Sequence, residues 1–141
     1  MPPLSKWMVR FALVYLALGF TFGALILWNK GVPLHPALWL LVPVHVEFLL
    51  VGWLVQFVFG VAFWILPRLS PGPKYGRAAL AWLAFGLLNA GAMAAALARL
   101  PGAPPALGLA GRLAEAASAL LFAAYAWPRI RGVMKPAAKL S

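Results

Sequence analysis

Four long apolar stretches divide the chain, and the segments between them are short and rich in proline and glycine. The stretches lie at about 8–28, 37–66, 77–99 and 105–127. A helix needs about 20 apolar residues to cross a hydrocarbon core of about 30 Å, and each stretch meets that length. Because backbone groups in lipid must be hydrogen-bonded within their own segment, we expect helices. The pattern predicts an all-α polytopic membrane protein, a four-helix bundle forming a single domain over residues 1–141.

Composition supports this interpretation and narrows the chemistry. The chain has 141 residues, of which 65% are hydrophobic and 10% charged, and these proportions exclude an ordinary soluble domain. Cysteine is absent, which excludes disulfides, iron–sulfur clusters and haem attached covalently through cysteine. The sequence contains no glycine-rich phosphate loop and no HExxH motif, so hydrolysis and phosphoryl transfer are not expected.

The formal net charge of +10 is better explained by membrane topology than by nucleic acid. The basic residues gather before the first helix, between the second and third, and after the fourth: Lys6, Arg10, Arg68, Lys74, Arg77, Arg129, Arg131, Lys135 and Lys139. The positive-inside rule therefore predicts a multi-pass protein of the cytoplasmic membrane with both termini in the cytoplasm. The lipid bilayer is its expected surrounding, and nucleic acid is not an expected partner.

Few polar residues interrupt the predicted spans, and His45 is the most informative of them. On the predicted topology it lies in the outer half of the membrane, about 12 Å below the outer end of the second helix. An imidazole at this depth is either a structural hydrogen-bonding group between helices or an axial ligand to haem iron. At 100° per residue it shares a helix face with five others, Leu49, Gly52, Gln56, Phe59 and Phe63.

The remaining residues near this candidate site each have two interpretations. Gly52 either leaves room for a flat macrocycle or lets another helix approach, and the Gly19/Gly23 pair of the first helix is a GxxxG pattern that also permits close approach. Gln56 is either a further cofactor-binding residue on the face of His45 or an interhelical hydrogen-bonding group, and Asn89 is expected to form interhelical hydrogen bonds or an interface contact. Met93 on the third helix is either a sixth haem ligand or part of the core.

Both acidic residues of the protein fall inside the predicted spans. Glu115 is one turn from Arg112, so an ion pair within the fourth helix is expected, with a role in a proton path as the alternative. Glu47 lies about 200° around the helix from His45, so the two side chains do not ligate one ion. Glu47 is expected to be protonated, paired across helices or placed against another subunit.

The second helix also carries a longer pattern. His45 is followed by the pair Gly52-Trp53 and then by Phe59-Gly60-Val61-Ala62-Phe63-Trp64-Ile65-Leu66-Pro67. This stretch resembles the second transmembrane helix of the catalytic subunit of haem-copper oxidases, nearest the nitric oxide reductase and cbb3-type branch. The resemblance implies that His45 takes the position of an axial ligand to the low-spin b-type haem.

The chain departs from that family in its size and in its supply of ligands. The catalytic subunit has many more helices and further histidines, whereas this chain has only His35 besides His45, so it is not a complete oxidase or reductase. His35 lies roughly 15 Å along the helix axis from His45. A six-coordinate haem would therefore need Met93, His45 of a second protomer, or a ligand from another protein.

Three functions fit the sequence. The first is a b-type haem protein, as a homodimer or within a respiratory complex, that serves electron transfer, haem delivery or nitric oxide handling. The second is a haem-free accessory subunit of a nitric oxide reductase or terminal oxidase. The third is a proton-coupled transporter or channel that uses Glu47 and Glu115 as proton sites.

Overall fold

A computed structural model describes residues 1–68 and 75–131 of the chain, and it is all-α. Within this part, four helical segments are long and apolar enough to cross a membrane: Pro3–Gly31, Pro36–Ile65, Ala78–Leu97 and Pro105–Arg131. The predicted four-span, all-α architecture is therefore confirmed in its number of spans and their approximate positions.

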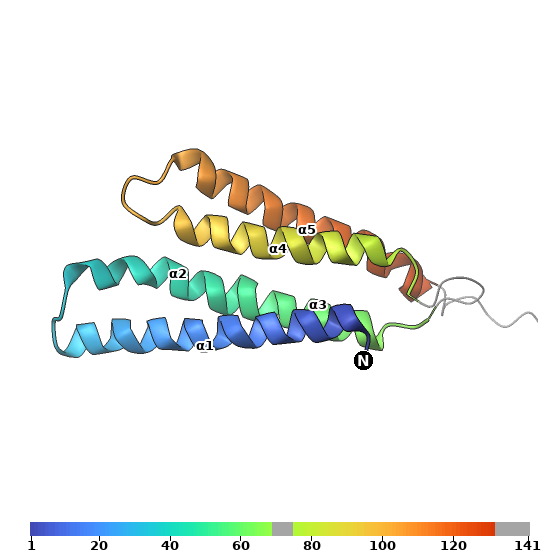
Figure 1. The fold of residues 1–141 in the computed structure, drawn as a ribbon, viewed down its shortest axis with the longest axis horizontal. Helices are drawn as coiled ribbons and strands as arrows, with labels where there is room; N and C mark the ends of the chain where they lie inside the picture. The colour runs from blue at the N-terminus through green and yellow to red at the C-terminus, as the bar shows by residue number, and fades with distance from the viewer. Residues whose placement is uncertain (69–74, 132–141) are drawn as a thin grey trace, which may run out of the picture.

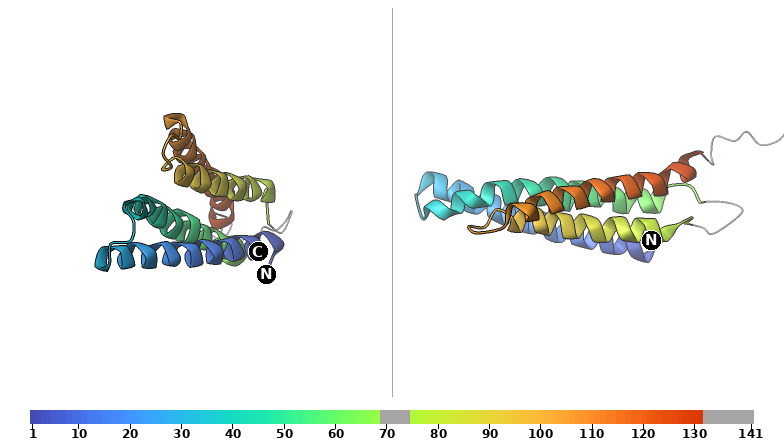
Figure 2. Two further views of the ribbon diagram at one scale, coloured as in Figure 1. Left: turned by 60° about the vertical axis from the view of Figure 1, so that its left-hand side comes forward. Right: turned by 90° about the horizontal axis from the view of Figure 1, so that it is seen from above.

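The spans are arranged as two antiparallel hairpins that lie side by side (Figure 1). Helix α1 (Pro3–Gly31) packs against the second span, and α4 (Ala78–Leu97) makes its most extensive contact with α5 (Pro105–Arg131). The connections at residues 32–35 and 98–104 lie at the same end of the bundle, here named the loop end. The N-terminus and the end of α5 lie at the opposite end, named the terminal end (Figure 2).

The second span is not a uniform α-helix. It begins with a 3₁₀ turn, η1 (Pro36–Leu40), continues as α2 (Leu41–Glu47), widens into a π-helix, η2 (Phe48–Val55), and ends as α3 (Gln56–Ile65). Because a π-helix has more residues per turn than an α-helix, positions beyond η2 are rotated away from a regular 100° pattern.

This rotation corrects one detail of the expected helix face. Gly52 and Gly60 lie against Tyr15 and Met8 of α1. Phe59, which the regular pattern placed on the same face, instead stacks on Phe122 of α5, with ring centroids 4.0 Å apart.

Helices α1 and α5 are longer than the apolar stretches that predicted them. Helix α1 begins at Pro3 rather than near residue 8, and α5 continues through Pro128 to Arg131 rather than ending near residue 127. The hydrophobic stretch marks the part that lipid requires to be apolar, whereas the helical backbone continues into flanking residues, of which Leu4, Ser5 and Arg129 are buried.

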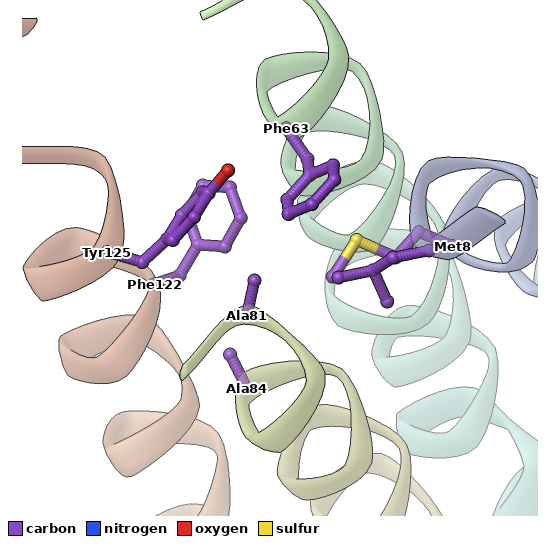
Figure 3. Close-up of a cluster of buried hydrophobic side chains, with 7 residues drawn as sticks. Met8, Phe63, Ala81, Ala84, Phe122 and Tyr125 are labelled. Carbon is purple, nitrogen blue, oxygen red and sulfur yellow. The ribbon is translucent and has the colours of Figure 1, made fainter. Parts of the chain in front are cut away.

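The core consists of two clusters of buried side chains. The cluster near the terminal end contains seven residues, drawn in Figure 3: Leu4, Met8, Phe63, Ala81, Ala84, Phe122 and Tyr125. The second contains Tyr15, Phe48, Ala92 and Ala96. Small alanines on α4 let the aromatic side chains of the neighbouring helices fill the centre of the bundle.

Candidate functional site

The imidazole of His45 lies against α1, directly over its GxxxG pattern. Its Nδ1 is 2.7 Å from the backbone carbonyl oxygen of Gly19. A Cβ atom at Gly23 would lie 2.7 Å from the Cε1 atom of the ring, so the missing side chain at Gly23 makes room for the imidazole. Gly19 therefore accepts a hydrogen bond from His45, and Gly23, one turn later, leaves space for its ring.

This contact determines which ring nitrogen carries the proton. A carbonyl oxygen only accepts hydrogen bonds, so Nδ1 must be the protonated nitrogen that donates to Gly19. Nε2 is then the ring nitrogen that can offer a lone pair to a ligand. Metal-binding histidines are commonly held in this way, with the distal nitrogen fixed by a backbone carbonyl.

The space beside Gly52 is occupied. A Cβ atom there would lie 2.5 Å from ring carbons of Tyr15, so the glycine lets α1 approach closely. Gln56, one turn further along, is fully buried and accepts a hydrogen bond of 2.8 Å from the Asn89 amide of α4. Gly52 and Gln56 therefore contact neighbouring helices of this chain.

The described residues offer no second haem ligand beside His45. Met93 is 43% exposed on the surface of α4. His35 lies at the loop end, where its Nδ1 accepts a hydrogen bond from the backbone N–H of Ala37 and caps the 3₁₀ turn. No group of three or more metal-binding side chains occurs within residues 1–68 and 75–131. The residues present therefore fit one axial ligand to a haem, and not a complete haem pocket.

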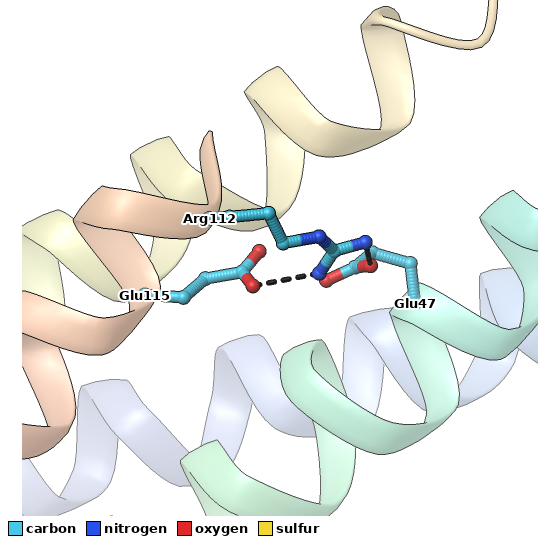
Figure 4. Close-up of polar contacts among 3 residues, drawn as sticks. All are labelled: Glu47, Arg112 and Glu115. Atoms are coloured by element: carbon cyan, nitrogen blue, oxygen red, sulfur yellow. Dashed lines mark hydrogen bonds and ion pairs between the residues drawn. The ribbon is translucent and has the colours of Figure 1, made fainter. Parts of the chain in front are cut away.

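A separate polar cluster joins the two hairpins (Figure 4). The guanidinium of Arg112 on α5 lies 2.5 Å from Oε2 of Glu47 on α2 and 2.7 Å from Oε2 of Glu115 on its own helix. The side chains of Glu47 and Glu115 are only 6% and 12% exposed, whereas that of Arg112 is 47% exposed. The fold thus pairs both acidic side chains of the chain with the guanidinium of Arg112.

Two oxygen atoms of this cluster lack a partner. Oε1 of Glu47 and Oε1 of Glu115 are both buried, and neither accepts a hydrogen bond from any described residue. Gly91 of α4 underlies Glu115, and a Cβ atom there would lie 2.8 Å from its Cγ atom. An unsatisfied buried carboxylate oxygen is costly, so a further proton or donor would stabilise the cluster.

Arg129 makes buried contacts, although the sequence predicted it only as one of the basic residues that set the membrane topology. It is 1% exposed, and its guanidinium donates to the backbone carbonyls of Phe63, Leu66 and Pro67 at the end of α3. It also bonds the hydroxyl of Tyr125, one turn earlier on α5. The signal in the sequence is Pro67, because a helix that ends before proline leaves free carbonyl groups near it.

Comparisons with known proteins add no assignment to this geometry. A scan against protein-family models, a search of curated proteins and a search of solved structures each gave no match for this chain.

Proposed function

We propose that this protein is a small subunit of a membrane respiratory assembly in which His45 is one axial ligand to a b-type haem. The observation that carries the proposal is the hydrogen bond from Nδ1 of His45 to Gly19, which places a proton on Nδ1 and leaves Nε2 as the ring nitrogen available to a metal ion. The sequence from His45 to Pro67, with its likeness to the haem-binding helix of haem-copper oxidases, supports the same assignment.

The residues around His45 would each contribute to ligation. The carbonyl of Gly19 fixes the tautomer and the orientation of the imidazole and increases the basicity of Nε2. Gly23 provides the space in which the ring lies. A haem, when bound, would supply one-electron transfer.

Among the described residues we find no further part of a haem site, so we expect another chain to complete it. Tyr15 fills the space beside Gly52, and Met93 points to the surface of α4, so this chain contributes one ligand from the α1–α2 seam. A second copy of the protein or a larger respiratory subunit would complete the site. The proposed function is therefore that of a partner in electron transfer or haem delivery, and not of a complete oxidase.

Haem content of purified variants tests this proposal. Wild-type protein, isolated from membranes in mild detergent, is expected to show a b-type spectrum on reduction with dithionite, with haem quantified as its pyridine haemochrome. His45→Gln keeps a side chain that donates to Gly19 but removes the imidazole, so it should lose most of the haem. His35→Ala is the matched control and should retain it, because His35 caps the 3₁₀ turn. Unchanged haem in folded His45→Gln protein would overturn the assignment.

The second candidate function is a haem-free accessory subunit, and the contact between Tyr15 and Gly52 favours it. That contact closes the face on which a macrocycle was expected and uses it for helix packing. Folded wild-type protein without haem that copurifies with a large respiratory subunit would support this function over the first.

A further inference from the structure

Glu47 and Glu115 are the only acidic side chains in the chain. They belong to different hairpins, and both form an ion pair with the guanidinium of Arg112. With both carboxylates ionised, the cluster with Arg112 would carry a net charge of −1 among apolar helices. It would also leave two buried oxygens without donors. An uncompensated charge at this depth is unfavourable, and a single added proton removes both problems, because it neutralises the cluster and supplies an O–H donor.

We propose that Glu47 and Glu115 share one exchangeable proton and form, with Arg112, a neutral proton-binding site inside the membrane-spanning bundle. The proton bound by one carboxyl group donates toward the other, while the Oε2 atoms of both remain on the guanidinium. This site is separate from His45, whose ring is directed to α1.

Apart from Arg112, no charged side chain among the described residues pairs with the two carboxyl groups, and the nearby cation Arg99 lines the cavity that Arg112 also lines. From α1, Tyr15 packs against Phe48, the residue next to Glu47, and its phenol is neutral at physiological pH. Helix α4 contributes Gly91 beneath Glu115 and carries no titratable side chain within Ala78–Leu97. Among the described residues packed around the carboxyl groups, Arg112 is the cation that contacts them.

A cavity near the loop end reaches Arg112, the cation of the site. It has a volume of about 260 Å³, lies between the facing ends of α4 and α5, and is lined by Arg112 together with Arg99 and small or apolar residues. Towards the terminal end, the stacked rings of Phe59 and Phe122 and the buried cluster of Figure 3 fill the bundle. On this proposal the proton exchanges through the loop end, where the cavity reaches Arg112.

Infrared spectroscopy tests this proposal directly, because the chain has only two acidic side chains. The full-length protein in an ester-free detergent at neutral pH is expected to show the C=O stretching band of one protonated carboxyl group per chain, shifted in D₂O. The terminal carboxylate is ionised at this pH and does not contribute. No protonated carboxyl band in the wild-type protein would overturn the proposal without the need for any variant.

Two substitutions test whether the proton is shared. Glu47→Gln and Glu115→Gln each leave one carboxylate on Arg112, so either change alone should abolish the band. A band that survives in one of them would show that the proton belongs to a single residue, and sharing would be wrong. His45→Gln is the matched control and should keep the band, which separates this proposal from the proposed haem function.

Discussion

At the residue scale, Arg129 shows how one side chain completes the end of another helix. Helix α3 stops at Ile65 because Pro67 follows, and carbonyl groups around this end have no intrahelical donor. The five N–H donors of a guanidinium suit such a set of acceptors, and Arg129 bonds three of the carbonyls. Its cationic group also lies 5.2 Å from the ring centroid of Tyr125.

We predict that Arg129→Ala destabilises the protein by on the order of 3 kcal/mol, because three backbone carbonyl groups at the end of α3 lose their donor together. The matched control is Arg131→Ala, two residues further on α5, whose guanidinium lies over the exposed ring of Trp127. The control should change stability by less than about 0.5 kcal/mol. Unfolding of both variants in mixed micelles of increasing denaturing detergent measures the difference, and equal effects would contradict the role given to Arg129.

At the element scale, the contact between α4 and α5 depends on two glycines that let the backbones meet. A Cβ atom at Gly111 would lie 2.8 Å from the backbone nitrogen of Ala95 and 2.9 Å from the carbonyl oxygen of Gly91. Backbone atoms cannot move aside as a flexible side chain does. Close packing of this kind is how helices associate in lipid, where the hydrophobic effect does not drive them together.

Gly111→Ala is therefore expected to cost about 1–3 kcal/mol, because the added methyl group forces the two backbones apart. Gly86→Ala on α4 provides the control, since a Cβ atom there meets nothing within 4 Å. The control should be neutral or slightly stabilising, because alanine favours the helix more than glycine does. Thermal unfolding followed by circular dichroism in detergent compares the two, and a Gly111→Ala variant as stable as the control would argue against this packing.

The elements also show how far the sequence could predict the fold and the candidate site. Span number and approximate position follow from hydropathy, because lipid imposes a minimum apolar length on each helix. The π-helix at Phe48–Val55 could not be predicted, since a periodicity analysis assumes one helical pitch. The pairing of Glu47 with Arg112 joins residues 65 positions apart, and no local pattern encodes such a contact.

At the scale of the whole molecule, the connection within each hairpin lies at the loop end, and the N-terminus and the end of α5 lie at the terminal end. Lys6, Arg10, Arg68 and Arg77 belong to the terminal end, whereas Lys30 and Arg99 flank the loop end. The positive-inside rule therefore predicts that the terminal end faces the cytoplasm.

Introduced cysteines test this orientation cleanly, because the chain has none of its own. Pro33→Cys and Pro101→Cys lie in the two connections of the loop end and should react in intact cells with a maleimide that does not cross the membrane. Tyr75→Cys lies at the terminal end before α4 and should react only after the cells are opened. The reverse labelling pattern would show that the orientation is inverted.

The capping of α3 by Arg129 has a consequence for the order in which the protein is made. The carbonyl groups of Phe63, Leu66 and Pro67 leave the ribosome long before their donor, which lies more than sixty positions later in the chain. During this interval the first hairpin has been synthesised but the end of its second helix is uncapped. Until the last helix is inserted, water and lipid headgroups at the membrane surface must donate hydrogen bonds to these carbonyl groups. The last turn of α5 thus caps α3, a helix that was translated earlier. The first hairpin therefore reaches its mature form only when the second hairpin is in place.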